Sequence, residues 1–189
     1  ILHPDAAKSK EAVERFKREA HAANRFKHPG AVEIRDADVT DEGEPFMVME
    51  QLEGESLARR LKREGSLPLE VVLRMAEEIL AVLEAAHAEG VIHRDIKPSN
   101  LFVEKDGRLR VLDFGVARLT RAPGTLITEV GTAMGTVAYM SPEQLKGAEI
   151  DHRADLYAVG ATMFRLLAGE YPHAATSEVE LVRTALSAL

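Results

Sequence analysis

Apolar residues recur every three or four positions in residues 11–26 and 66–90, which predicts a helix in each of these segments. Two further helices are expected at 57–63 and 155–168. The stripe in 66–90 is the strongest, and it starts at Ser66, a residue type that caps helices, with a proline in the first turn. Residues 155–168 are apolar almost all round, so we expect that helix to be buried.

Short apolar runs between the helices predict strands. Two runs, 32–39 and 45–52, flank an acidic, glycine-containing loop at 40–44. Two others, 101–103 and 109–112, are joined through an Asp-Gly pair, which is typical of a two-residue hairpin turn.

The remaining segments show no clean period. We expect a short polar link at 53–55 and a long loop, rich in Thr and Gly, at 117–141. The order is one helix, two strands and then mostly helix with small hairpins. This order indicates an α+β fold with a small sheet part and a larger helical part.

Composition narrows the class of protein. Of the 189 residues, 46% are hydrophobic and 29% charged, as in soluble globular proteins, and the net charge of −7 argues against general nucleic-acid binding. The absence of cysteine excludes disulfides and thiolate metal sites. The longest stretch without a charge, 130–142, is too short to span a membrane, and no secretion signal is visible. Because residue 1 is isoleucine, we expect the beginning of the protein to be missing.

Two short loops concentrate acidic and amide side chains, the oxygen ligands that Mg²⁺ prefers. Residues 93–100 read HRDIKPSN, residues 113–115 read DFG, and residues 141–143 read SPE. In this order and spacing the chain resembles the eukaryotic-type serine/threonine protein kinases, and especially their bacterial members. The resemblance extends from residue 1 to about residue 172.

The resemblance implies a two-lobe protein-kinase fold with ATP bound between the lobes. Residues 1–52 would form part of the N-lobe, with its helix, two strands and the start of the hinge, and residues 53–189 would form the mostly helical C-lobe. No glycine-rich loop and no V-A-I-K strand precede Glu19, and the last C-lobe helices would follow residue 189. We therefore expect an incomplete catalytic domain that is inactive by itself.

The resemblance also implies a role for each polar residue of the motifs. Asp95 would accept the proton of the substrate hydroxyl, and Lys97 would steady the γ-phosphate. Asn100 and Asp113 would hold Mg²⁺, with Mn²⁺ as an alternative. Glu19 would pair with a strand lysine, although its position also suits a solvated helix face.

The adenine of ATP would bind at the hinge. Met49 resembles the gatekeeper, and backbone groups of Glu50 and Leu52 would meet the adenine. Phe102 would form the floor under the ring. Four further residues would hold the loops in place: His93, Phe114, Glu143 and Asp155. Asp155 would fix the backbone at 93–95, and Glu143 would pair with an arginine beyond this chain.

Regulation is expected in the loop between the second and third motifs. Arg94 resembles the arginine of kinases that are activated by loop phosphorylation, where it can bond a phosphothreonine. Thr128 is the first choice for that phosphate and Thr132 the second. Lys97 together with Thr136, in the substrate-facing loop, is typical of kinases that act on Ser and Thr.

Three functions remain open at this point. The first is a serine/threonine protein kinase, with protein substrates, ATP and dimerisation for autophosphorylation. The second is a pseudokinase that binds nucleotide or partners without catalysis, although Asp95, Asn100 and Asp113 are all present. The third is a small-molecule kinase of the aminoglycoside-phosphotransferase type, which lacks a long loop ending in Ser-Pro-Glu. The need for ATP and the lack of a signal indicate a cytoplasmic protein, or the cytoplasmic part of a membrane-anchored one.

Overall fold

The computed structural model describes residue 14 and residues 26–41, 44–114, 134–173 and 178–187. The strands are β1 (Ile34–Val39), β2 (Pro45–Met49), β3 (Gly54–Ser56), β4 (Leu101–Glu104) and β5 (Leu109–Val111). The helices are α2 (Leu57–Glu64), α3 (Leu69–Ala88), the 3-10 turn η2 (Pro98–Asn100), α4 (Met134–Val137), α5 (Pro142–Lys146), α6 (Arg153–Ala168) and α7 (Glu178–Ser187).

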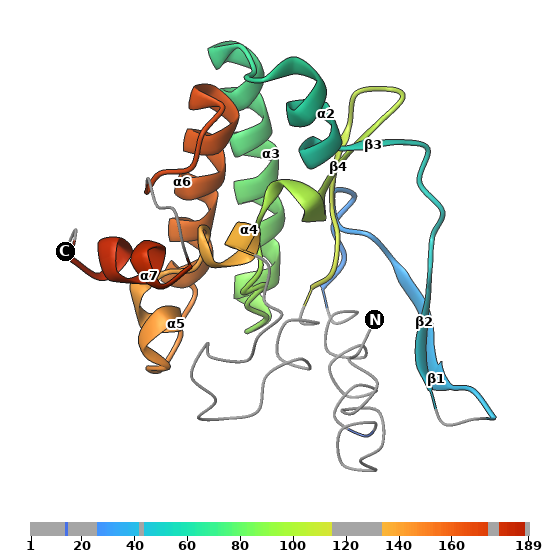
Figure 1. Cartoon of the computed structure of the whole chain (residues 1–189). Coiled ribbons are helices and arrows are strands. Elements are labelled where there is room, and N and C mark those ends of the chain that lie inside the picture. The colour runs from blue at the N-terminus through green and yellow to red at the C-terminus, as the bar shows by residue number, and fades with distance from the viewer. Residues whose placement is uncertain (1–13, 15–25, 42–43, 115–133, 174–177, 188–189) are drawn as a thin grey trace.

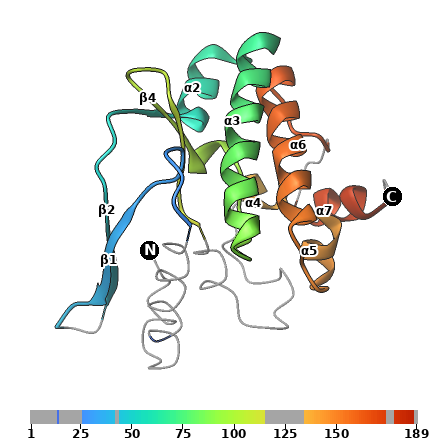
Figure 2. The same cartoon turned by 180° about the vertical axis from the view of Figure 1, so that it is seen from behind.

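Helices dominate one side of the molecule and strands the other (Figures 1 and 2). Helices α3 and α6 lie side by side in both views, and α5 and α7 lie next to the lower part of α6. The antiparallel pair β1–β2 projects on the opposite side, and the three-stranded antiparallel sheet β3-β4-β5 connects it to the helices. This arrangement confirms the α+β class with a small sheet part.

The main apolar core surrounds α3. The apolar residues of α3 follow the 3.6-residue period and therefore lie on one face of the helix. That face is buried against α2, α6 and the strands. The fully buried side chains of this core include Leu57, Ile79, Leu83, Ile96, Leu101 and Leu166. A second, smaller core joins α4, α5, α6 and α7 and includes Val137, Tyr139, Leu145 and Ala185.

The start of α3 differs from the prediction that Ser66 caps it. The N-cap is Pro68, and no side chain caps the helix. Leu67 is buried and donates its N–H to the Leu166 carbonyl oxygen (2.8 Å). The segment before α3 is therefore hydrogen-bonded to α6 and does not join the first turn of α3. A residue that precedes proline disfavours helical geometry, which delays the start of α3 to Leu69.

Two short segments also differ from the predictions. Residues 53–55, expected to be a polar link, contribute to β3 because a free edge of β4 is available for pairing. Glycine is required at position 54, since the Cβ of any other residue would overlap the Val103 carbonyl oxygen. The β4–β5 hairpin has three residues in its loop rather than two, since the Glu104 N–H donates to the Arg108 carbonyl oxygen (2.9 Å). Gly107 adopts φ 90°, the left-handed residue that such three-residue loops require.

Two longer segments also require correction. The segment predicted as a long loop at 117–141 contains the short helix α4, which is held by the second core. Helix α6 is not buried all round, since Leu156 and Phe164 are exposed. Within the described residues α6 packs on one side only, against α3 and the second core, and its opposite face is therefore left open.

Candidate active site

The loop between α3 and η2 carries the first motif and is built around His93. This side chain is fully buried; its Nε2 donates to the Leu112 carbonyl oxygen (2.7 Å), and its Nδ1 accepts the Asp95 N–H (3.2 Å). A ring that donates on one nitrogen and accepts on the other is neutral. Burial lowers the pKa of His93 and thereby favours this neutral form. His93 therefore connects the first motif loop to the residue just before the second.

Two non-glycine residues of the motifs have left-handed backbone geometry. Arg94 has φ 69° and Asp113 has φ 59°, a conformation that costs roughly 1–3 kcal/mol and needs support from its surroundings. Asp155, fully buried in the first turn of α6, supplies that support for the first loop. Its Oδ1 accepts the Arg94 N–H (2.7 Å), and its Oδ2 accepts the His93 N–H (2.8 Å) and contacts His87 Nε2 (2.7 Å).

Asp95 is held through one of its two carboxylate oxygens. Asn100 Nδ2 donates to Asp95 Oδ2 and to the Asp95 carbonyl oxygen (2.9 Å each). Lys97 Nζ lies 2.8 Å from the same Oδ2 and also donates to Thr136 Oγ1 (3.2 Å). Among the described residues, Asp95 Oδ1 has no hydrogen-bond partner. This oxygen can therefore accept a proton from the hydroxyl group of another molecule.

The second motif lies beside the first because the Leu112 N–H donates to the Asn100 carbonyl oxygen (2.9 Å). Asp113 follows directly, and no hydrogen bond or ion pair in the described part of the chain engages its carboxylate. Asn100 uses its amide nitrogen on Asp95, and from the residues that the structure describes its amide oxygen accepts only the Ser99 Oγ hydroxyl (3.3 Å). A free carboxylate and an available amide oxygen fit a hard divalent cation such as Mg²⁺.

An aromatic stack joins the two loops to the segment that precedes β1. The Phe114 ring centroid lies 4.5 Å from that of His93 and 4.7 Å from that of Phe26, both in edge-to-face geometry. Such pairs contribute about 0.5–1.5 kcal/mol each beyond their burial. Phe114 thus fixes the backbone on the far side of Asp113.

The predicted hinge follows β2. Met49 ends the strand with 41% of its surface exposed, and the Glu50 N–H donates to the Glu33 carbonyl oxygen (3.1 Å). Within the described residues, the Glu50 carbonyl and both backbone groups of Leu52 have no protein partner and can bind a ligand. Phe102 is half-buried on β4 and pairs with Ser56 on β3.

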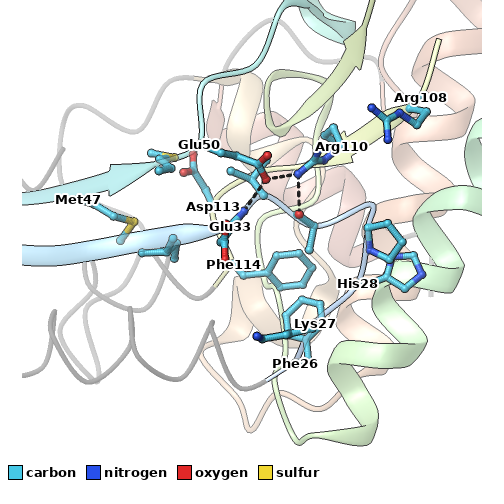
Figure 3. A pocket seen from close by; sticks show the side chains of 15 residues that line it. Phe26, Lys27, His28, Glu33, Met47, Glu50, Arg108, Arg110, Asp113 and Phe114 are labelled. Carbon is cyan, nitrogen blue, oxygen red and sulfur yellow. Dashed lines mark hydrogen bonds and ion pairs between the residues drawn. The ribbon is translucent and has the colours of Figure 1, made fainter. Parts of the chain in front are cut away.

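A cavity of about 550 Å³ lies between the hinge and the second motif (Figure 3). Its walls include Met49, Glu50, Asp113 and Phe114, but not Phe102 or the first motif at 93–100. Arg110, buried on β5, closes one wall: its guanidinium donates to the Glu50 carboxylate, to the Ala31 carbonyl oxygen (3.0 Å) and to Glu104 (3.3 Å). Arg110 thereby ties the hinge to the β4–β5 hairpin.

The structure does not bring all predicted site residues together. Glu19, Thr128 and Thr132 lie outside the described residues. Among the described residues, no ion pair engages the Glu143 carboxylate. Its charge still acts on a neighbour: the pKa of Tyr157 is raised, first by burial and secondarily by the charge of Glu143.

Sequence reasoning missed three residues of the site. The S-x-x-Q pattern at 141–144 indicates a capping box and could have singled out Gln144. No local signal marks His87, because its partner Asp155 is 68 residues away. Arg110 likewise gave no signal, since a strand arginine is ordinarily exposed.

The first motif loop, anchored on Asp155 of α6, and the Asp113 loop bonded beside it form an arrangement typical of the protein kinase class. The family model for the protein kinase domain matches residues 1–188, and the chain belongs to this family. The resemblance stated above is therefore confirmed.

Curated relatives are serine/threonine protein kinases by name. The chain is 40% identical to serine/threonine-protein kinase pkn3 of Myxococcus xanthus over 185 residues, which cover 95% of this chain and 34% of that protein. It is 36% identical to PrkC of Bacillus subtilis over 188 residues, covering 100% of this chain and 28% of that protein. The chain thus spans about a third of the length of these relatives.

A solved structure shows the same fold. The kinase domain of Mycobacterium tuberculosis PknI, as its C20A mutant, matches with a TM-score of 0.72 and 28% identity, covering 97% of this chain and 68% of that one. None of the helices in the described ranges is both long and apolar enough to cross a membrane.

Proposed function

We propose that the protein is a serine/threonine protein kinase that transfers the γ-phosphate of ATP to hydroxyl groups of protein substrates. The observation that carries this proposal is the arrangement at Asp95, whose Oδ2 is held by Lys97 and Asn100 while, within the described residues, Oδ1 stays available. The names of the relatives support the same activity.

In this reaction the substrate hydroxyl oxygen bonds to the γ-phosphorus while the bond to the bridging oxygen of ADP breaks. Asp95 takes the hydroxyl proton on its free oxygen, and the Lys97 ammonium, next to it, offsets negative charge on the transferred group. Asp113 and Asn100 would hold Mg²⁺, or alternatively Mn²⁺, which supplies charge neutralisation at the phosphates. The neutral, buried His93 and the Asp155 carboxylate keep this loop in place.

The remaining parts of the proposal concern the nucleotide and the lobes. Adenine would meet the Glu50 carbonyl and the Leu52 backbone, beside Met49 and over Phe102. The lobe boundary would follow residue 52, so that the hinge begins where Arg110 anchors Glu50.

Regulation and location complete the proposal. A phosphate on Thr128 or Thr132 would pair with Arg94, and Thr136, bonded to Lys97, would face the substrate hydroxyl. Autophosphorylation of this kind would require dimers, and the supply of ATP indicates the cytoplasm. A pseudokinase is not favoured, because Asp95, Asn100 and Asp113 are all retained.

The test is transfer of label from [γ-³²P]ATP by the protein, expressed with any sequence that its gene places on either side of residues 1–189. A basic protein rich in Ser and Thr and a panel of aminoglycosides serve as acceptors. We expect phosphoserine and phosphothreonine on the protein, no labelled aminoglycoside, and no transfer by Asp113→Asn. Labelled aminoglycoside alone, or nucleotide binding without any transfer, would overturn the proposal.

A further inference from the structure

Gln144 occupies the first turn of α5, directly after the third motif, and it is 92% buried. It forms a reciprocal capping box: the Ser141 N–H donates to Gln144 Oε1 (2.9 Å), and the Gln144 N–H donates to Ser141 Oγ (3.4 Å). Glutamate serves as well as glutamine in a capping box. Capping therefore does not explain why this side chain carries an amide.

The other end of the amide explains it. Gln144 Nε2 donates to the carbonyl oxygen of Arg94 (2.9 Å), 50 residues earlier in the chain. That carbonyl belongs to the peptide group joining Arg94 to Asp95. Only an amide can accept from Ser141 and donate to Arg94 at the same time, because a carboxylate has no N–H.

Arg94 is the strained residue of the catalytic loop, and side chains of two helices hold its two peptide groups. Asp155 of α6 accepts its N–H, and Gln144 of α5 donates to its carbonyl oxygen. Strained geometry persists only where the surroundings over-determine it. The peptide group that Gln144 holds leads directly into Asp95.

We infer that Gln144 is a positioning residue for Asp95, connecting the substrate-facing segment 134–146 to the catalytic loop. This inference rests on the proposed kinase function. The contact between Lys97 and Thr136 joins the same two segments, so the Gln144 bond keeps the base in register with the segment that faces the substrate. Loss of the amide donor lowers kcat and leaves the KM for ATP unchanged, because the hinge is remote from α5.

The decisive variant is Gln144→Glu, which keeps the acceptor for Ser141 and removes the donor to Arg94. Ser141→Ala is the matched control: it removes the hydroxyl half of the capping box and leaves the Arg94 bond intact. We measure kcat, KM for ATP and KM for the protein substrate, together with thermal unfolding midpoints. For Gln144→Glu we expect kcat to fall about tenfold or more with the KM for ATP within about twofold, since small misplacements of reacting groups are costly. For Ser141→Ala we expect a lower midpoint and a kcat within about twofold of the wild type.

Several outcomes would overturn the inference. A wild-type kcat in Gln144→Glu would do so, and so would an equal loss in both variants, because that would reduce the role of Gln144 to capping. Should Gln144→Glu not fold, Gln144→Met removes the donor without a charge, and activity that falls only with the folded fraction would contradict a positioning role. A wild-type protein without transfer activity would instead refute the proposed function.

Discussion

Replacing Asp155 by asparagine tests how the catalytic loop is supported. The carboxylate is fully buried and accepts three hydrogen bonds of 2.7–2.8 Å, from the backbone N–H groups of His93 and Arg94 and from His87 Nε2. Asparagine keeps the shape of the side chain but replaces one oxygen by an NH₂ group. Because the two backbone N–H groups bind different oxygens, either orientation of the amide places an N–H donor against one of them.

The magnitude follows from these contacts. One buried N–H left without an acceptor costs about 1–3 kcal/mol. The bonds that remain lose their charge assistance, and charge-assisted bonds are roughly twice as strong as neutral ones, which removes about 1–2 kcal/mol more. We therefore expect Asp155→Asn to lower the free energy of unfolding by about 2–5 kcal/mol, a large part of the 5–15 kcal/mol typical of a domain.

The assay is urea unfolding followed by circular dichroism, with the free energy of unfolding and the m-value fitted for each protein. Asp151→Asn is the matched control: Asp151 lies just before the same helix, but its side chain is 48% exposed and, among the described residues, pairs only with the exposed Arg153. We expect a much smaller loss there. A change below about 0.5 kcal/mol in Asp155→Asn, with the m-value unchanged, would refute the claim that this carboxylate supports the loop.

Three further predictions concern acid stability, glycine geometry and the metal site. Burial lowers the pKa of His93, so on acidification the imidazole is protonated in the unfolded chain near pH 6.5, before it is protonated in the folded protein. The free energy of unfolding should therefore fall below that pH, by at most about 1.4 kcal/mol per pH unit. Urea titrations at several pH values should show a shallower fall in His93→Gln. Gly169→Ala should lower the unfolding midpoint, because φ is 74° and a Cβ would lie 2.6 Å from the Gly65 carbonyl oxygen. Gly160→Ala, in open space on α6, should instead stabilise the protein by about 0.5–1 kcal/mol. The reverse order of the two midpoints would contradict the structure. Asp113→Ala should abolish Mg²⁺-dependent ATP binding in calorimetry, and an unchanged affinity would refute the metal assignment.

The helices and strands with a strong local period were predictable from the sequence. The stripe of α3 arises from burial of one face, and that pattern is visible in the residues themselves. Strands β1 and β2 were predictable as two apolar runs on either side of an acidic, glycine-containing loop. Strand β3 was not predictable in this way, because it forms only where β4 offers an edge and Gly54 allows close approach. The open face of α6 was missed because hydrophobicity alone does not say which face of a helix is covered.

The motif residues of the site were predictable because their order and spacing are specific, but their supports were not. The left-handed geometry of Arg94 depends on acceptors and donors from helices 50 and 61 residues away. The partner of His87, Asp155, is 68 residues away. Local pattern contains no information about such pairs: the S-x-x-Q pattern can mark Gln144 as a capping residue, but its bond to Arg94 emerged only from the structure.

The central claim is that Asp95 acts as the base in phosphotransfer, and Asp95→Asn tests it most directly. The measurement is single-turnover transfer from ATP to a protein substrate, with nucleotide affinity determined alongside. General base catalysis contributes about 10²- to 10⁴-fold, so we expect the rate to fall by that factor while ATP affinity stays within about twofold. The neighbouring Lys97 and Asn100 keep their donors, and the asparagine at 95 fills the same space, so the loop itself should persist. A variant that retains a third or more of the wild-type rate would contradict the account.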